Sequence, residues 1–205
     1  DYFYEVSDTK LTYTNYVTPA YYRAIHPRSY YDDIGIQFGV RAEELVIEAL
    51  TALKNGGFDF TLYDSNNDLV VDAVNILYAG TRNPFWGAGL WPHSSWVNFE
   101  AGTVTCGPYQ MTDIGNILTL GTFAHENGHM ICFWPDLYDY GGESNGVGNF
   151  CLMGYGGPSE LNPVEPCAYL KMTAGWSTVL PIGAGSEAGL TIPAGTNTCY
   201  RIPHP

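Results

Sequence analysis

The sequence predicts an α/β (α+β) fold, with an N-terminal lobe of mixed sheet and helices, a central helix and an irregular C-terminal lobe. Three observations lead to this prediction. Apolar residues recur at helical spacing between positions 42 and 53, a Val-, Ile- and Leu-rich stretch covers 69–79, and a Gly-rich stretch covers 141–157. We expect a single domain over 1–205, with its lobes at 1–130 and 131–205.

The first predicted helix rests on a repeated apolar face. Six residues fall at i, i+3, i+4, i+7, i+8 and i+11, which places them on one side of a helix: Ala42, Leu45, Val46, Ala49, Leu50 and Leu53. The run Asn55-Gly56-Gly57 ends it, because glycine adopts the left-handed conformation that closes many helices. We interpret this helix as scaffold.

Two strands are predicted before the central helix. Residues 69–79 form a continuous apolar run typical of a buried strand, and residues 104–111 indicate a second strand. Between them, residues 80–96 contain Pro84, Pro92 and many aromatic residues, which favours a long surface loop.

The central helix is predicted to begin near Thr112 or Asp113, either of which can cap it, and to stop near Phe133 because Trp134-Pro135 cannot continue it. A short helix is expected over 166–174, and two short strands over 189–203.

The charge balance restricts the partners. With 21 acidic and 8 basic residues the formal net charge is −13, which disfavours nucleic acid and anionic membranes. No apolar run approaches the length of a membrane span. The polar, lightly charged composition is common in secreted proteins, and we expect a secreted monomer. Because the chain starts at Asp1 without a leader, we expect a processed form.

The motif His125-Glu126-Asn127-Gly128-His129 predicts a metal centre. Residues four apart on a helix project from the same face, so both imidazoles can reach one zinc ion. Glu126 lies close enough to take a proton from the zinc-bound water as it attacks a carbonyl, without being a ligand itself. The alternative is a chance match in a surface helix.

A catalytic zinc site needs a third protein ligand from outside this motif. We expect Asp136, because it follows the helix end and Pro135 fixes its approach, with Asp139 as a reserve that instead orients a histidine. The full set of candidates is Asp136, Asp139, Glu143, Glu160, Glu165, His26, His93 and His204. His93 is more typical of a hydrogen-bonded structural histidine.

An Asp-rich segment offers a second cation site. Asp64, Asn66, Asp68 and Asp72 take positions 1, 3, 5 and 9 of a calcium-loop pattern, although Leu69 stands where such loops have glycine. The alternative is an Asx-rich turn with solvated carboxylates.

Three ordered stretches resemble a known family: residues 121–129, which contain the HExxH motif, residues 135–139 (Pro-Asp-Leu-Tyr-Asp) and residues 148–153 (Gly-Asn-Phe-Cys-Leu-Met). Together they are similar to the immune inhibitor A-type (M6) secreted metalloproteases, which belong to or border on the metzincin zinc peptidases. Further stretches extend the resemblance over most of the chain: 2–7, 58–60, 90–93, 168–171 and 175–176.

The resemblance implies a metzincin-like zincin fold in which Met153 forms the Met-turn beneath the metal. It also implies that Tyr155 lies near the metal, where it could stabilise an oxyanion, the alternative being a packed tyrosine. Two departures stand out. Cys132-Phe133 replaces the usual glycine three residues after the second histidine, and Asp136 comes one residue later than in the commonest spacing.

The five cysteines contain no CxxC pair, so we do not expect them to bind zinc. In a secreted protein they would form up to two disulfides, the alternative being buried free thiols. A bridge from Cys132 to Cys151 would join the helix end to the Met-turn implied by the resemblance, and we expect that pairing.

The sequence therefore predicts a zinc-dependent endopeptidase that cleaves protein or peptide substrates, with zinc and also calcium as cofactors. The alternative is a non-catalytic carbohydrate- or protein-binding module with a structural metal site. Glu126 separates the two, because a structural site does not need a carboxylate at that position.

Overall fold

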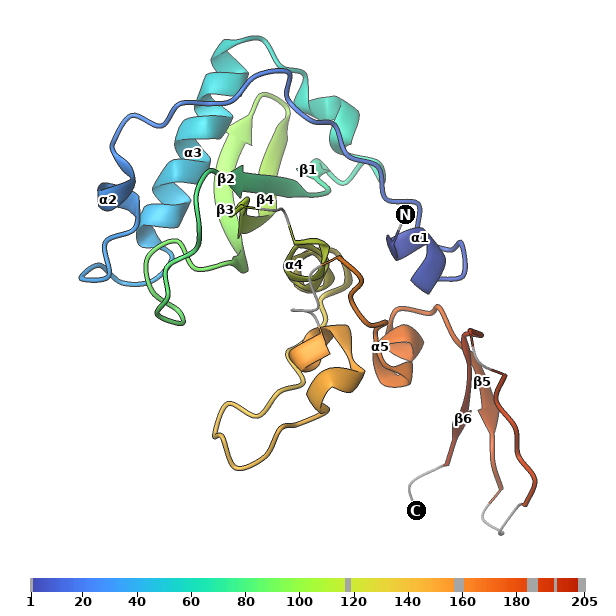
Figure 1. Cartoon of the computed structure of the whole chain (residues 1–205). Coiled ribbons are helices and arrows are strands. Elements are labelled where there is room, and N and C mark those ends of the chain that lie inside the picture. Colours follow the sequence, from blue (N-terminus) through green and yellow to red (C-terminus); the bar gives the residue numbers. More distant parts are fainter. Residues whose placement is uncertain (1, 117–118, 157–160, 184–187, 194, 203–205) are drawn as a thin grey trace. The chain divides into compact units, whose positions relative to one another are not determined.

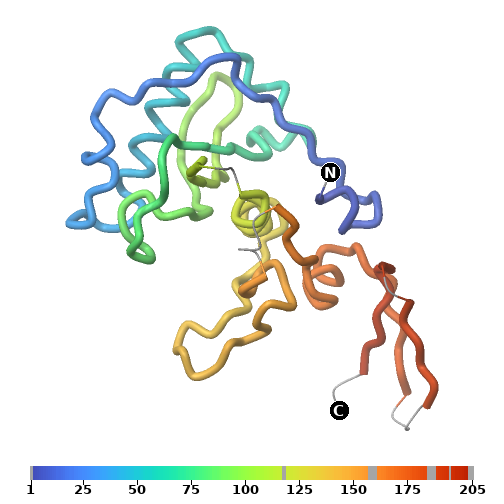
Figure 2. Tube along the Cα trace, in the orientation of Figure 1, coloured from blue at the N-terminus to red at the C-terminus, as the bar shows by residue number. Residues whose placement is uncertain are grey.

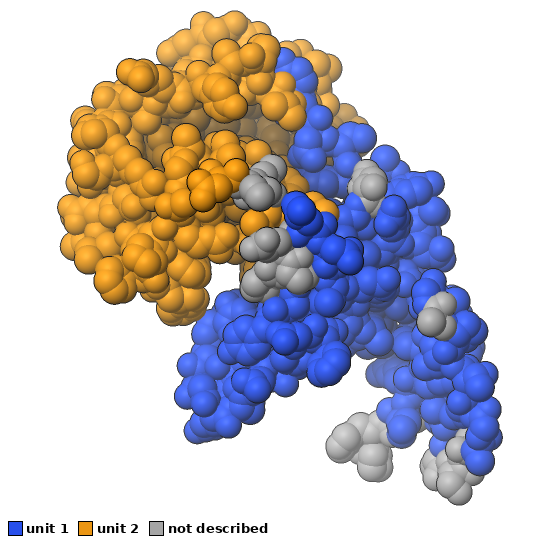
Figure 3. Space-filling view, in the orientation of Figure 1, with its two compact units in different colours: residues 1–16, 134–205 blue, residues 17–133 orange. Residues whose placement is uncertain are grey.

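The computed structural model describes residues 2–116, 119–156, 161–183, 188–193 and 195–202 (Figure 1). The chain divides into two compact units, one formed by residues 17–133 and the other by residues 1–16 and 134–205 (Figure 3). The first 16 residues thus group with the C-terminal part of the chain. We refer to 17–133 as the sheet unit and to the other as the turn unit, and each is described by itself.

The sheet unit is built around strand β4 (Val104–Asp113). β4 pairs in parallel with β1 (Val70–Val71) and β2 (Val74–Tyr78), and antiparallel with β3 (His93–Ala101). Ala101 opposes Val104 across a turn in which Gly102 has a φ of +80°, a conformation that favours glycine. Figure 2 traces this hairpin of β3 and β4.

Helix α3 (Val40–Asn55) confirms the helix predicted from apolar periodicity. Its buried residues are Ala42, Leu45, Val46 and Leu50, and they join the apolar core that also contains Val97, Tyr109 and Met111 from the sheet. Gly56 caps the helix, as predicted. Figure 1 shows α3 lying alongside the sheet. Two shorter elements complete this part of the unit: α2 (Arg28–Tyr31) and the 3-10 helix η1 (Phe60–Tyr63).

Three sequence predictions in the sheet unit needed correction. The apolar run 69–79 forms two short strands instead of one. The predicted loop 80–96 ends in the first residues of β3, which the sequence did not reveal. The central helix does not begin at Thr112 or Asp113, because these residues are the last two of β4.

The turn unit holds short elements: α1 (Tyr2–Val6), the 3-10 helix η2 (Gly148–Phe150), η3 (Leu152–Gly156), α5 (Ala168–Thr173), and the parallel strands β5 (Thr178–Pro181) and β6 (Thr198–Arg201). α5 confirms the short helix expected over 166–174. Among the described residues of 189–203, only β6 is a strand, and its partner comes from 178–181, so the two-strand prediction there is half right.

Two hydrogen bonds attach α1 to the rest of the turn unit. The Tyr2 hydroxyl donates to the carbonyl oxygen of Val164 at 2.8 Å, and the Asn197 side chain donates to that of Val6 at 2.9 Å. Across the described residues of both units, no helix has the length and apolar character needed to cross a bilayer.

Candidate metal centre

The motif lies on helix α4 (Leu120–Cys132), which packs against β3 and β4 in the sheet unit. Gly121, Ala124 and Gly128 are buried and fall three and four residues apart, so they share one face of the helix. The same spacing leaves His125 and His129 together on another face.

The two histidines converge on one point. The Nε2 atoms of His125 and His129 are 3.2 Å apart, and their rings meet edge to face with centroids 4.8 Å apart. Two nitrogens bound to one zinc at about 2.0–2.1 Å and a tetrahedral angle lie roughly 3.3 Å from each other. The pair therefore has the spacing of two ligands to a single tetrahedral ion.

Glu126 and Asn127 follow His125 on the buried side of α4. Glu126 is only 7% exposed, and Asn127 is fully buried with its side-chain amide donating to the carbonyl oxygen of Phe123 at 2.8 Å. Burying a carboxylate costs free energy, so such a group beside two imidazoles is more typical of a chemical role than of a structural one.

An ion pair that was not predicted from the sequence lies at the end of β4. The Arg82 Nε atom is 3.0 Å from the Asp113 carboxylate at the end of β4. The Arg82 guanidinium also donates to the Thr122 hydroxyl at 3.3 Å. Arg82 thus links the end of the central strand to the first turn of the helix, three residues before His125.

Phe133 explains how the helix ends without a glycine. Its φ of 54° and ψ of 31° place it in the left-handed region, and its N–H donates to the carbonyl oxygen of Gly128. The chain reversal that glycine usually provides is therefore made by Phe133, four residues after His129. The predicted helix end is confirmed.

In the turn unit, Asp136 is held by tyrosines. The Tyr140 hydroxyl donates to Asp136 Oδ2, and the Tyr138 hydroxyl is also hydrogen-bonded to this carboxylate. Burial, followed by these contacts with Asp136, raises the pKa of Tyr138 well above its usual range. The Tyr138 phenol consequently stays protonated at neutral pH, and both hydroxyls can orient the carboxylate through their hydrogen bonds.

Met153 and Tyr155 lie on the η3 turn. Met153 is fully buried, and a Cβ on the neighbouring Gly156 would come within 2.7 Å of the Cys151 carbonyl oxygen, so the turn has no room there for a side chain. Tyr155 is 45% exposed and its ring stacks on that of Tyr138, with centroids 5.7 Å apart. The stacking agrees with the packed-tyrosine alternative and leaves its hydroxyl role a prediction.

Asp139, the reserve ligand, is engaged in its own loop. Its carboxylate accepts hydrogen bonds from the N–H groups of Gly141 and Ser144, both at 2.8 Å, and from the Ser144 hydroxyl at 3.1 Å. These donors lower the pKa of Asp139. Its contacts describe a turn-forming residue, which favours Asp136 over Asp139 as the ligand. Two further candidates, Glu160 and His204, lie outside the described residues.

The Asp-rich loop of the sheet unit shows the hydrogen bonds of an Asx-rich turn. Asp64 accepts from the N–H groups of Asp68 and Leu69, both at 3.0 Å, and Asp72 accepts from that of Ser65 at 3.1 Å. Asn66 and Asp68 make similar bonds to the backbone of the same loop. This pattern agrees with the turn alternative. Calcium binding stays a prediction.

His93 is confirmed as a structural histidine. Its Nδ1 lies 2.7 Å from the carbonyl oxygen of Trp91, and its Nε2 lies 3.1 Å from the Tyr109 hydroxyl. Since a carbonyl can only accept, Nδ1 carries the proton and Nε2 accepts from Tyr109. Burial lowers the pKa of His93, which keeps the ring neutral.

The five cysteines are free thiols in this structure, so the predicted bridge between Cys132 and Cys151 is not formed. Cys106, Cys132 and Cys151 have raised pKa values, because burial disfavours the thiolate. The nearest thiol neighbour of Cys151 in the turn unit is Cys167, whose N–H points at the Cys151 sulfur.

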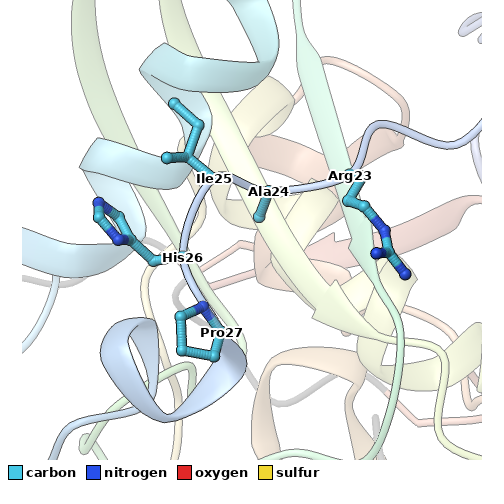
Figure 4. A pocket seen from close by; sticks show the side chains of 5 residues that line it. All are labelled: Arg23, Ala24, Ile25, His26 and Pro27. Carbon is cyan, nitrogen blue, oxygen red and sulfur yellow. The ribbon is translucent and has the colours of Figure 1, made fainter.

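A shallow pocket lies elsewhere on the sheet unit. It is lined by five consecutive residues, Arg23 to Pro27, on the extended segment before α2 (Figure 4). Figure 4 shows the side chains of Arg23 and His26 pointing to opposite sides of this segment. No motif residue contributes to the pocket, and we assign it no role.

Comparison with known proteins adds no relative: no family model matches the chain, and no curated protein matches it.

Proposed function

We propose that this chain is a zinc-dependent endopeptidase. The observation that carries the proposal is the 3.2 Å separation of the Nε2 atoms of His125 and His129 on α4. These histidines flank the buried carboxylate of Glu126, which makes the helix suited to hydrolysis as well as to metal binding.

The proposed zinc ligands are His125, His129 and Asp136. Two imidazole nitrogens and one carboxylate oxygen match the three-ligand donor set of catalytic zinc. Asp136 is the carboxylate whose orientation two tyrosines control, and it follows the left-handed turn at Phe133 by three residues. We favour it as third ligand for both reasons.

Each residue then has a defined task. Bound zinc would lower the pKa of a coordinated water and polarise the scissile carbonyl. Glu126 accepts the proton of the attacking water and later delivers it to the leaving nitrogen. Tyr155 is proposed to donate a hydrogen bond to the oxyanion that develops on the carbonyl.

The remaining elements of the proposal follow the resemblance. The chain would adopt a metzincin-like fold with Met153 in the Met-turn, act outside the cell as a monomer, and take protein or peptide substrates. The Asp64–Asp72 loop would bind calcium. The described α+β architecture supports this assignment only at the level of fold class.

Metal analysis together with casein degradation tests the proposal. We expect the wild type to hold about one zinc per chain and to degrade casein, and the His125→Ala variant to lose both properties. His93→Ala is the matched control, because this histidine is hydrogen-bonded within the sheet and is not a proposed ligand. It should retain zinc.

Two outcomes would count against the proposal. A wild type that holds stoichiometric zinc but cleaves neither casein nor shorter peptides would favour the alternative of a binding module with a structural metal. A wild type that holds no metal after dialysis against zinc would remove the metal centre altogether.

A further inference from the structure

A pair of cysteines lies at the base of the η3 turn. Cys151 is fully buried, and its carbonyl oxygen accepts hydrogen bonds from the N–H groups of Gly154 and Gly156, at 3.0 and 3.1 Å. Cys151 is therefore the first residue of the turn that carries Met153, and its carbonyl oxygen accepts the hydrogen bonds that close this turn. Its sulfur accepts a hydrogen bond from the N–H of Met153.

The segment that precedes α5 runs beside this turn. The N–H of Leu152 donates to the carbonyl oxygen of Glu165 at 3.2 Å, and the N–H of Cys167 donates to the Cys151 sulfur at 3.2 Å. The two thiols are also within hydrogen-bonding reach of each other. Both cysteines belong to the turn unit, so their proximity does not depend on the placement of the sheet unit.

We propose that Cys151 and Cys167 form a disulfide when the protein meets an oxidising environment. The bridge would join the Met153 turn to the residue immediately before α5, and would close a loop of intermediate length. It takes the place of the Cys132–Cys151 bridge predicted from the sequence. The proposal does not rest on zinc binding or on peptidase activity.

The two thiols differ in access, which sets the order of the reaction. Cys167 is partly exposed whereas Cys151 is buried, so the Cys167 thiolate attacks a low-molecular-weight disulfide such as oxidised glutathione. One glutathione thiol leaves and a mixed disulfide remains on Cys167. The Cys151 thiolate then attacks the Cys167 sulfur and releases the second glutathione. The cysteines lose two electrons and two protons in total, and the oxidised glutathione gains them.

Peptide mapping of the full chain tests this pairing. The protein is equilibrated with oxidised and reduced glutathione, its remaining thiols are alkylated, and it is cleaved after glutamate. Cleavage after Glu143 and Glu160 places Cys151 in peptide 144–160, separate from the peptide that contains Cys167, while Cys132 falls in peptide 127–143. We expect one cross-link, between the Cys151 and Cys167 peptides.

The alkylation count and two variants make the result decisive. Oxidation should remove two of the five thiols and leave three for alkylation. Cys167→Ser should leave Cys151 alkylated, whereas Cys132→Ser should retain the cross-link. Five alkylated cysteines in the oxidised wild type, or a link from Cys151 to any cysteine other than Cys167, would overturn the proposal.

Discussion

The N–H of Leu137 donates to the carbonyl oxygen of Met153 at 2.7 Å, so the residue after Asp136 is hydrogen-bonded to the η3 turn. The carbonyl oxygen of Leu137 in turn accepts from the N–H of Val147 at 2.9 Å. Within the turn unit, the backbone next to Asp136 is therefore held by two hydrogen bonds, one through the N–H and one through the carbonyl oxygen of Leu137. A carboxylate on such a backbone is better ordered than one on a free loop.

The first prediction concerns Asp136. We expect Asp136→Ala to weaken zinc binding by more than the roughly 10–100-fold that loss of an outer-shell partner costs, because a ligand is removed outright. Competition with a fluorescent chelator measures the affinity. Asp139→Ala is the matched control, because the Asp139 carboxylate accepts hydrogen bonds within a local turn. The zinc affinity of this variant should stay within a few-fold of that of the wild type. Equal losses in both variants would leave Asp136 without a special role.

The second prediction concerns Phe133. An L-residue in the left-handed region is disfavoured by roughly 1–2 kcal/mol. Glycine avoids this strain, but it lowers the free energy of unfolding by about 0.5–1 kcal/mol because it gives the unfolded chain more conformational freedom. Phe133 is 82% exposed, so its ring contributes little packing. We expect Phe133→Gly to raise the free energy of unfolding by about 0.5–1 kcal/mol.

Phe150→Gly serves as the control for this change. Phe150 is similarly exposed, at 89%, but lies in a 3-10 helix without a positive φ. Its replacement by glycine should not stabilise the protein. Urea unfolding of both variants compares them, and a loss of stability in Phe133→Gly would show that its ring makes a contact that outweighs the strain.

The third prediction concerns pH and His93. Above about pH 6.5 His93 is neutral in both the folded and the unfolded chain, and its neutral-state hydrogen bonds are intact. Below that pH the unfolded chain binds a proton that the folded chain does not, because burial lowers the folded pKa. The free energy of unfolding should therefore fall as the pH drops from 6.5 towards the lowered pKa.

The variant His93→Asn isolates this effect, because its amide can donate to Trp91 as Nδ1 does but does not titrate. The free energy of unfolding, measured by urea titration between pH 5 and 8, should depend less on pH in the variant. The two slopes should differ by at most about 1.4 kcal/mol per pH unit. If wild type and variant showed the same slope, His93 would not be the group responsible.

The sequence predicted those elements in which side-chain periodicity and burial agree. Helix α3 has its apolar residues on one face, and Gly56 ends it as expected. The HExxH motif predicted the convergence of His125 and His129 because helix geometry alone brings residues four apart together. These features depend on local chain geometry, which the sequence determines directly.

The errors arose where polar residues are satisfied by partners distant in the chain. Gln110 and Thr112 are fully buried in β4, where the Gln110 amide donates to Asn75 at 2.9 Å and Thr112 donates to Gln110. Without knowledge of these partners, Thr112 was interpreted as a helix cap, whereas it lies near the end of the central strand β4. The proximity of Cys151 and Cys167 was missed for a similar reason, since the backbone contact between Leu152 and Glu165 brings their two segments together.

The most direct test of the central claim compares the zinc-loaded wild type with Glu126→Gln. Glutamine keeps the size of the side chain but cannot accept a proton, so we expect zinc content to be unchanged and kcat/KM for a peptide substrate to fall by about 10²–10⁴-fold. If Glu126→Gln bound zinc normally and cleaved the peptide as fast as the wild type, Glu126 would not be the general base and the proposed hydrolytic centre would be contradicted.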